Sequence, residues 1–192
     1  MLKGINVSIR TIKEADLESL FDLLNDIDSQ GEFLPVSLTS EHKLRSQYLE
    51  NGFISYTSEQ YLITNRSEEI VGSIWAFKSV PYFDAIEVGY QIFDHENRGK
   101  GYASEALAMF YQYIFETKQI NRIELRIATE NEPSAKVALK VGFTLEGTNR
   151  EAAYSKGKLH DMKVYAMLRR EWLANKDISG QAAECGVRSI DI

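Results

Sequence analysis

The sequence has little cysteine and proline, and it contains no long hydrophobic run. One cysteine, Cys185, stands among 192 residues, so the chain can form neither an intramolecular disulfide nor a zinc site built from several cysteines. No stretch approaches the roughly 18 consecutive apolar residues of a membrane-spanning helix. The first ten residues, MLKGINVSIR, lack the apolar segment of a secretory signal. We therefore expect a cytoplasmic protein without a membrane anchor.

An excess of positive charge is also missing. The chain has 22 lysine and arginine residues against 28 aspartate and glutamate residues, a net charge of −6. Because non-specific binding to nucleic acid depends on neutralising phosphates, we expect no direct nucleic-acid partner. His42, His95 and His160 share no metal-ligand spacing, so we expect no metal site and place these residues at the surface or in loops.

Helical patterns dominate the N-terminal quarter, after a short first strand. Thr11 and Glu14 have the spacing of a capping box, and apolar residues follow at helical intervals from Leu17 to Ile27. Residues 29–39 are expected to form a loop. Residues 40–51 are expected to form a second helix that ends at Gly52.

The middle of the chain is rich in residues that favour strands. Residues 60–64 and 70–78 flank the polar turn 65–69 and are expected to pair as a hairpin. A third strand is expected at residues 85–93. A long helix should then begin near Ala103.

Strands and a helix alternate in the C-terminal half. Residues 122–129 alternate between apolar and charged side chains, with Glu124 and Arg126 on one face, which predicts a half-buried strand. Pro133 and Gly142 mark the start and the end of a helix. Short strands are expected at residues 143–147 and 161–169, the second one after the turn 156–158.

These elements together predict an α+β fold, with α/β layers around a single mixed, mostly antiparallel central sheet that helices flank. The length and the 44% hydrophobic composition suit one domain that buries roughly 70% of the surface of its unfolded chain. Residues 175–192 show no periodicity. We therefore expect a domain at residues 1–174 and a polar C-terminal tail at 175–192, loosely ordered or appended to the surface.

A glycine-rich turn carries the clearest chemical signal. Residues 98–103, RGKGYA, lie between the expected strand 85–93 and a helix. Glycine leaves backbone N–H groups accessible to an anion, and a helix N-terminus adds donors and a favourable dipole. Arg98 and Lys100 supply positive charge. The turn is therefore expected to bind a phosphate or a pyrophosphate.

Two common nucleotide motifs fit this turn poorly. A P-loop has a serine or threonine after its lysine, and Lys100 is followed by Gly101. The dinucleotide fingerprint has a third glycine where this chain has Ser104. Its strand–turn–helix unit also stands near the start of the fold, whereas here the turn lies midway along the chain. The ligand is therefore expected to be of another kind.

The form Arg-x-x-Gly-x-Ala at Arg98, Gly101 and Ala103 resembles the acetyl-CoA signature of the GNAT N-acetyltransferase superfamily. The segment from Asn131 to Ser134, followed by the pair GF at residues 142–143, resembles a second motif of that family. Residues 145–154 and 157–161 are similar to a branch described as ribosomal-protein alanine N-acetyltransferase-like. The resemblance spans residues 6–172, with two departures. His95 replaces a frequent proline, and Ala153 stands where some relatives carry a glutamate proposed as the base.

The resemblance implies a GNAT-like fold that uses acetyl-CoA as cosubstrate. The expected reaction is direct attack of a primary amine on the thioester. The acceptor is a protein N-terminus or a small amine such as a polyamine, an amino sugar or an antibiotic, and the enzyme is a monomer or a homodimer. A CoA-binding module with little catalysis is the alternative. The expected cofactor-binding residues are Ile92, Phe93, Arg98, Gly99, Lys100, Gly101, Tyr102, Ala103, Ser104, Asn131 and Ser134.

Three residues are candidates for the proton transfers of this reaction. Glu87, on the strand before the turn, is a candidate base acting directly or through water, or else a structural carboxylate bonded to an arginine or tyrosine. Ser134 is expected to contact the thiol or the pantetheine arm, or else to be an ordinary residue of a helix's first turn. Tyr154 either protonates the thiolate, shapes the acceptor pocket or lies at the edge of the core. Tyr90 has the same ambiguity.

Overall fold

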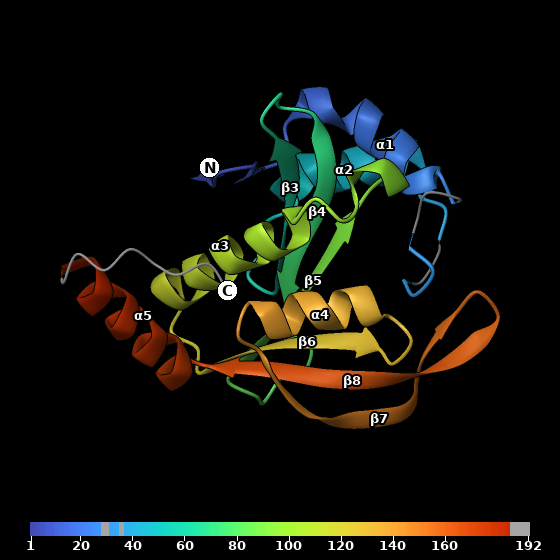
Figure 1. Ribbon diagram of the computed structural model, residues 1–192. Coiled ribbons are helices and arrows are strands. Elements are labelled where there is room, and N and C mark those ends of the chain that lie inside the picture. Colours follow the sequence, from blue (N-terminus) through green and yellow to red (C-terminus); the bar gives the residue numbers. More distant parts are fainter. Residues whose placement is uncertain (28–30, 35–36, 185–192) are drawn as a thin grey trace.

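The computed structural model describes residues 1–27, 31–34 and 37–184, with side chains as far as Lys176 in the last helix. Its strands form an eight-stranded sheet in the order β1-β2-β3-β4-β5-β6-β8-β7 (Figure 1). Neighbouring strands are antiparallel except β5 and β6, which are parallel. This confirms the expected mixed, mostly antiparallel sheet. The strands are β1 (Leu2–Lys3), β2 (Val7–Arg10), β3 (Ser58–Asn65), β4 (Ile70–Phe77), β5 (Ala85–Ile92), β6 (Arg122–Ala128), β7 (Thr144–Ser155) and β8 (Lys158–Leu168).

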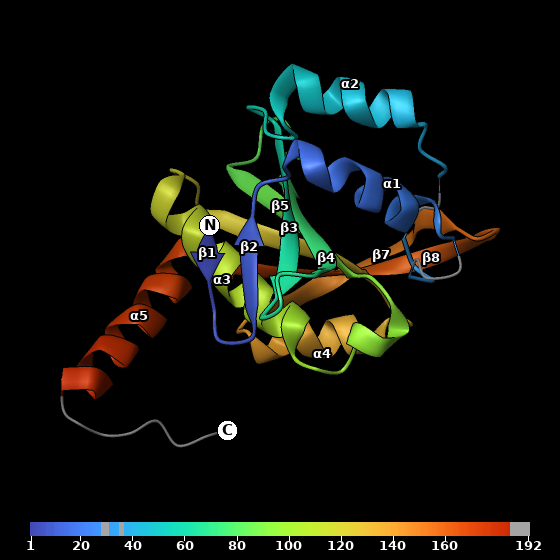
Figure 2. The ribbon, with the colours of Figure 1, turned by 90° about the horizontal axis from the view of Figure 1, so that it is seen from above.

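Helices cover both faces of the sheet. Figure 2 shows α1 and α2 on one face and α3 and α4 on the other. The apolar side chains accordingly form two cores. Leu20, Leu44 and Phe93 belong to the core under α1 and α2, whereas Phe110 and Ile123 belong to the core under α3 and α4. The helices are α1 (Leu17–Asn25), α2 (Glu41–Asn51), α3 (Tyr102–Thr117), α4 (Glu132–Lys140) and α5 (Arg169–Glu184), with short 3-10 turns η1 (Glu14–Asp16) and η2 (His95–Asn97).

The helix starts differ in how well the sequence predicts them. For α2, the Ser40 hydroxyl accepts from the Lys43 N–H at 3.2 Å, and Gly52 ends the helix at a φ of +61°, as expected. The capping box expected at Thr11 is wrong. The Lys13 N–H instead donates to the Asp16 carboxylate at 2.7 Å, which Arg10 also binds at 2.6 Å. This arginine fixes the start of the helical segment two residues later than the motif predicts.

Two expectations about strands need correction. Strand β7 runs for 12 residues and β8 for 11, so both are longer than expected. They are joined at Lys156 and Gly157, with φ angles of +46° and +81°. Strand β7 lies at the edge of the sheet and is exposed along most of its length. Its sequence therefore lacks the alternation of apolar residues by which a half-buried strand is predicted. Strand β6 is not half-buried, because Glu124 on its charged face is only 4% exposed.

Helix α5 occupies most of the segment where a tail was expected. It crosses the expected boundary at residues 174/175, and residues 175–184 are helical. The Arg169 guanidinium donates to three backbone carbonyls around the end of α3, those of Phe115, Lys118 and Ile120, at 2.8, 2.6 and 2.7 Å. The Trp172 ring stacks on Phe115 at 5.3 Å. Residues 185–192, including Cys185, lie outside the described part.

Candidate active site

Strands β5 and β6 separate part-way along their length. They pair only at Ala85/Arg122, Ile86/Ile123 and Glu87/Glu124, and beyond Glu87 each strand keeps only its other neighbour. Figure 1 shows β5 and β6 diverging beyond this point. We call the space between the separated ends the β5–β6 gap. Ligands of open α/β sheets bind beyond the carboxyl ends of parallel strands, and this gap opens at those ends.

The glycine-rich turn follows β5 at the rim of this gap. Gly99 and Gly101 have φ angles of +74° and +82°, and a Cβ at either position would have no atom within 4 Å. Gly101 is also the N-cap of α3, so the amides of the first turn, from Tyr102 to Ser104, lie at the helix N-terminus. With the charges of Arg98 and Lys100, the turn fits a pyrophosphate: its backbone is accessible and its donors are grouped.

The end of β5 contributes backbone groups to this region more readily than side chains. The Phe93 ring is 1% exposed and belongs to the core under α1 and α2. The Phe93 N–H already donates to the Val71 carbonyl at 2.9 Å. Ile92 is half-buried against the other core. Ile92 and Phe93 therefore offer backbone atoms to the gap, and their expected contact with the pantetheine arm stays a prediction.

Helix α4 begins on the opposite side of the gap. Asn131 is its N-cap, and the Asn131 side-chain oxygen accepts from the Ser134 N–H at 3.2 Å. The Ser134 hydroxyl lies 2.7 Å from the hydroxyl of Tyr90 on β5. Burial raises the pKa of Tyr90 to about 12, and the hydrogen bond with Ser134 lowers it only in part. The structure therefore joins two of the candidate residues across the gap.

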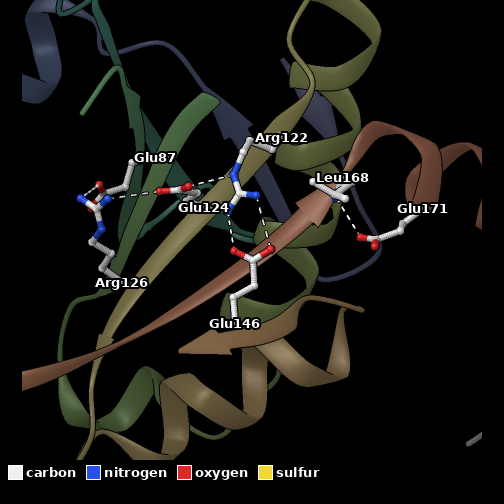
Figure 3. A network of polar contacts seen from close by, with 7 residues as sticks. All are labelled: Glu87, Arg122, Glu124, Arg126, Glu146, Leu168 and Glu171. Carbon is white, nitrogen blue, oxygen red and sulfur yellow. Dashed lines mark hydrogen bonds and ion pairs between the residues drawn. The ribbon is translucent and has the colours of Figure 1, made fainter. Parts of the chain in front are cut away.

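Glu87 belongs to a chain of ion pairs, shown in Figure 3. Arg126 donates to Glu87 at 2.7 Å and to Glu124 at 3.2 Å. Arg122 donates to Glu124 at 2.8 Å and to Glu146 at 2.6 Å. Glu87 therefore has an arginine partner, as expected if it is a structural carboxylate. Sequence reasoning missed the role of Arg126, although the alternation of Glu124 and Arg126 beside a central strand was a signal for it.

Burial raises the pKa of Glu87, and Glu124 raises it further, while Arg126 and a hydrogen bond with Ser79 lower it. The Glu87 side chain is 14% exposed, so the desolvation of the carboxylate outweighs the arginine. A carboxyl group with a raised pKa is better matched to proton abstraction near neutral pH than an ordinary one. The ion pair with Arg126 and the raised pKa of Glu87 are therefore compatible. The ion pair does not exclude Glu87 as a general base.

Glu87 and Tyr90 lie on opposite faces of the sheet. Alternate residues of a strand face opposite sides. Val88 and Tyr90 pack with the core under α3 and α4, whereas Phe93 packs under α1 and α2. Glu87 shares the face of Phe93. One side of the gap therefore offers a carboxylate and the other side offers a pair of hydroxyls.

The far edge of the Glu87 face is closed by the β7–β8 hairpin. The Ser155 hydroxyl donates to the Glu32 carbonyl at 3.2 Å, and the His160 ring meets Phe33 edge-on at 5.8 Å. His160 is 9% exposed, so the expected surface or loop position is wrong for this histidine. Tyr154 is 65% exposed beside this contact, so its interpretation as a core-edge residue is also wrong. No contact joins Tyr154 to Glu87 or Ser134 among the described residues.

A sequence profile of the acetyltransferase (GNAT) domain matches residues 6–144. The chain belongs to the GNAT acetyltransferase family. It is 29% identical over 178 residues to the putative ribosomal N-acetyltransferase YdaF of Bacillus subtilis, covering 89% of this chain and 96% of YdaF. Two solved structures share its fold, each with a TM-score of 0.73.

The first of these is spermidine N-acetyltransferase from Vibrio cholerae with CoA and spermine, 21% identical, covering 87% of this chain and 98% of that one. The second is RimL, a ribosomal L7/L12 alpha-N-protein acetyltransferase, with CoA, 24% identical, covering 86% and 95%. The GNAT resemblance and the expected cosubstrate are thereby confirmed: the protein is an acetyl-CoA-dependent N-acetyltransferase. Among the described residues no helix is long and apolar enough to cross a membrane. The same residues hold no cluster of three or more metal-ligating side chains.

Proposed function

We propose that the enzyme acetylates the terminal amine of a protein or peptide, with acetyl-CoA bound at the glycine-rich turn. The observation that carries this proposal is the pairing of the charges on the Glu87 face. The three carboxylates of the network, Glu87, Glu124 and Glu146, each contact Arg122 or Arg126, so the negative charge of this network is compensated. A polyamine carries several positive charges and needs several carboxylates, whereas a peptide terminus carries one.

The similarity to YdaF over 89% of the chain supports the same acceptor class. The border of the Glu87 face adds a physical reason. Segment 31–34 lies against the β7–β8 hairpin through Ser155 and His160, and both elements offer backbone groups and aromatic side chains beside the approach. Such groups suit an extended peptide that follows its reacting amine. Tyr154, exposed at this border, is proposed to contact the acceptor.

Glu87 is the proposed base. The reaction needs a neutral amine, because an ammonium group has no lone pair to attack the thioester. The half-buried Glu87 carboxylate lies at the last paired position before the gap, where it can take the proton directly or through a water molecule. Arg126 keeps the carboxylate oriented, and the neutral form that results after proton transfer is the form that burial favours.

Ser134 is the proposed donor to the departing sulfur. Acetyl-CoA supplies the activated acyl group, so no nucleophile of the chain is required. The Ser134 hydroxyl lies in the first turn of α4, on the face opposite Glu87. A donor there can meet the thiolate while the amine approaches from the other face. Tyr154 is exposed and does not suit this step, because a hydroxyl group in contact with water stabilises a developing charge less than one in a site that excludes water.

The test is the release of free thiol from acetyl-CoA with three acceptors: peptides with free N-termini, the same peptides with blocked N-termini, and spermidine. We expect release with the free peptides alone, and acetylation of the terminal amine by mass spectrometry. A matched pair of peptides with and without internal lysine separates the terminal amine from side-chain amines. Turnover of spermidine but of no peptide would contradict the acceptor class and leave the acetyltransferase assignment intact.

A further inference from the structure

The hydrogen bond between Tyr90 and Ser134 spans the β5–β6 gap. Tyr90 lies three residues beyond Glu87, the last residue of β5 that pairs with β6. Its hydroxyl oxygen is 2.7 Å from the Ser134 hydroxyl and 3.4 Å from the Ser134 carbonyl. The bond therefore connects β5 to the first turn of α4 at the place where the thioester has to enter. We infer that Tyr90 is a positioning residue that fixes the Ser134 hydroxyl toward the sulfur of the bound thioester.

This inference rests on the proposed role of Ser134. A serine hydroxyl rotates freely about its Cβ–Oγ bond and can both donate and accept. The Ser134 backbone is fixed independently, because its N–H donates to Asn131 at 3.2 Å. What remains undetermined is the direction of the hydroxyl proton. When a neighbouring group donates a hydrogen bond to the Ser134 oxygen, the proton of Ser134 itself is directed away from that group.

Tyr90 is suited to be this donor. Burial raises the pKa of Tyr90 to about 12, so its hydroxyl keeps its proton at every pH at which the enzyme is expected to work. Both acceptors near the Tyr90 hydroxyl belong to the same residue, the oxygen atoms of Ser134. When Tyr90 donates, its proton therefore goes to an oxygen of Ser134 in either case. With Tyr90 as donor, the serine proton is free for the sulfur.

The ring of Tyr90 has a separate, structural task. It packs against the core under α3 and α4 together with Ile92 and Tyr102. Tyr90→Phe keeps this packing and removes only the hydroxyl, which makes it the informative variant. Tyr113→Phe is the matched control. It removes another half-buried tyrosine hydroxyl, one that lies 3.4 Å from the Tyr61 hydroxyl and near the opposite end of α3 from the glycine-rich turn.

The experiment is a double-mutant cycle with wild type, Tyr90→Phe, Ser134→Ala and the double variant. Calorimetric binding of CoA is the first readout, because it needs no acceptor. We expect each single variant to weaken CoA binding about fivefold, the effect of one net hydrogen bond. We expect the double variant to bind no more weakly than Ser134→Ala alone, because both changes remove the same contact. Tyr113→Phe should bind as wild type does.

The second readout is turnover with the acceptor that gives most thiol release. Tyr90→Phe is expected to lower kcat about tenfold, a part of the usual contribution of general acid catalysis, with the KM for the acceptor unchanged. In the Ser134→Ala background the same change should have no further effect. Effects of Tyr90→Phe that are equal in both backgrounds, or absent from both readouts, would overturn the inference. Failure of the wild-type enzyme to bind CoA would instead contradict the proposed function. The experiment therefore distinguishes failure of the proposed function from failure of the inference on Tyr90.

Discussion

At the scale of single residues, Glu87 combines burial with an arginine partner. The structure places it 2.7 Å from Arg126 and leaves 14% of its side chain exposed. We predict that Glu87→Gln lowers kcat about 100-fold, because the amide cannot accept a proton and general base catalysis commonly contributes about that factor. Steady-state thiol release measures the change. Glu146→Gln is the control, since it alters the far end of the same network and should leave kcat within about twofold.

The pH profile tests the same carboxyl group in another way. The pKa of Glu87 is raised by burial and held down by Arg126. A base must be ionised to act, so kcat/KM should fall as the pH drops through this pKa. Arg126→Gln removes the lowering influence, and the acid limb should therefore move to higher pH. An acid limb that moves to lower pH, or that Glu87→Gln leaves in place, would assign the limb to another group.

Residues also show where sequence reasoning reached its limit. The glycines of the turn were predictable, because a positive φ at Gly99 and Gly101 is a property of glycine itself. The partners of Glu87 and Ser134 were not, because Arg126 and Tyr90 come from elements whose spacing along the chain is set by the fold. His160 was placed wrongly for the same reason: Phe33, which covers it, is more than a hundred residues away in the sequence.

At the scale of elements, the junction between α3 and α5 is the clearest case of one residue that holds two helices. Arg169 donates to the carbonyls of Phe115, Lys118 and Ile120, and its guanidinium lies 5.3 Å from the Phe115 ring. We predict that Arg169→Ala destabilises the fold by about 3 kcal/mol, because three part-buried carbonyls lose a charged donor. A fall in Tm of about 6 to 12 °C follows for a chain of this size.

Thermal unfolding followed by circular dichroism measures this change. Arg45→Ala is the control, because the Arg45–Glu41 ion pair lies on α2, away from this junction, and its side chains are 49% and 61% exposed. An exposed pair contributes about 0 to 1 kcal/mol, so the Tm should change by less than about 4 °C. Equal losses in the two variants would show that Arg169 contributes no more than a surface charge.

Elements with a strong pattern of their own were predicted, and those that depend on a neighbour were not. The hairpin of β3 and β4 and the helix α4, with Asn131 and Pro133 at its start, carry their signals locally. Helix α5 does not, because it is anchored near its start, where its residues Arg169 and Trp172 contact the end of α3 and the residues that follow it. Strand β7 is polar and exposed at the edge, and only its pairing with β8 defines its length.

At the scale of the whole molecule, the proposed cofactor site lies between two parts of the sheet. Strand β5 leads to α3 on one side of the gap and β6 leads to α4 on the other. We predict that acetyl-CoA at about 100 times its Kd stabilises the fold by about 2.7 kcal/mol. The Tm should rise by about 5 to 11 °C. Differential scanning fluorimetry measures the shift.

Gly101→Glu provides the control for this shift. Gly101 has a φ of +82° and is the N-cap of α3, so a glutamate there is strained, blocks the amides and repels phosphate. The variant should keep a cooperative transition and lose the response to acetyl-CoA. A response of wild-type size in Gly101→Glu would contradict the assignment of the turn to the cofactor.

The order of strands has a consequence for how the molecule is made. Strand β8 lies between β6 and β7, although β7 comes first in the chain, so β7 cannot join the sheet until β8 has left the ribosome. Ser155 and its partner Glu32 are 123 residues apart, which at about 5 to 20 residues per second means a delay of roughly 6 to 25 s. The glycine-rich turn is synthesised well inside that interval. During translation, therefore, the proposed cofactor side can be assembled before the part of the β7–β8 hairpin that contacts segment 31–34 has emerged.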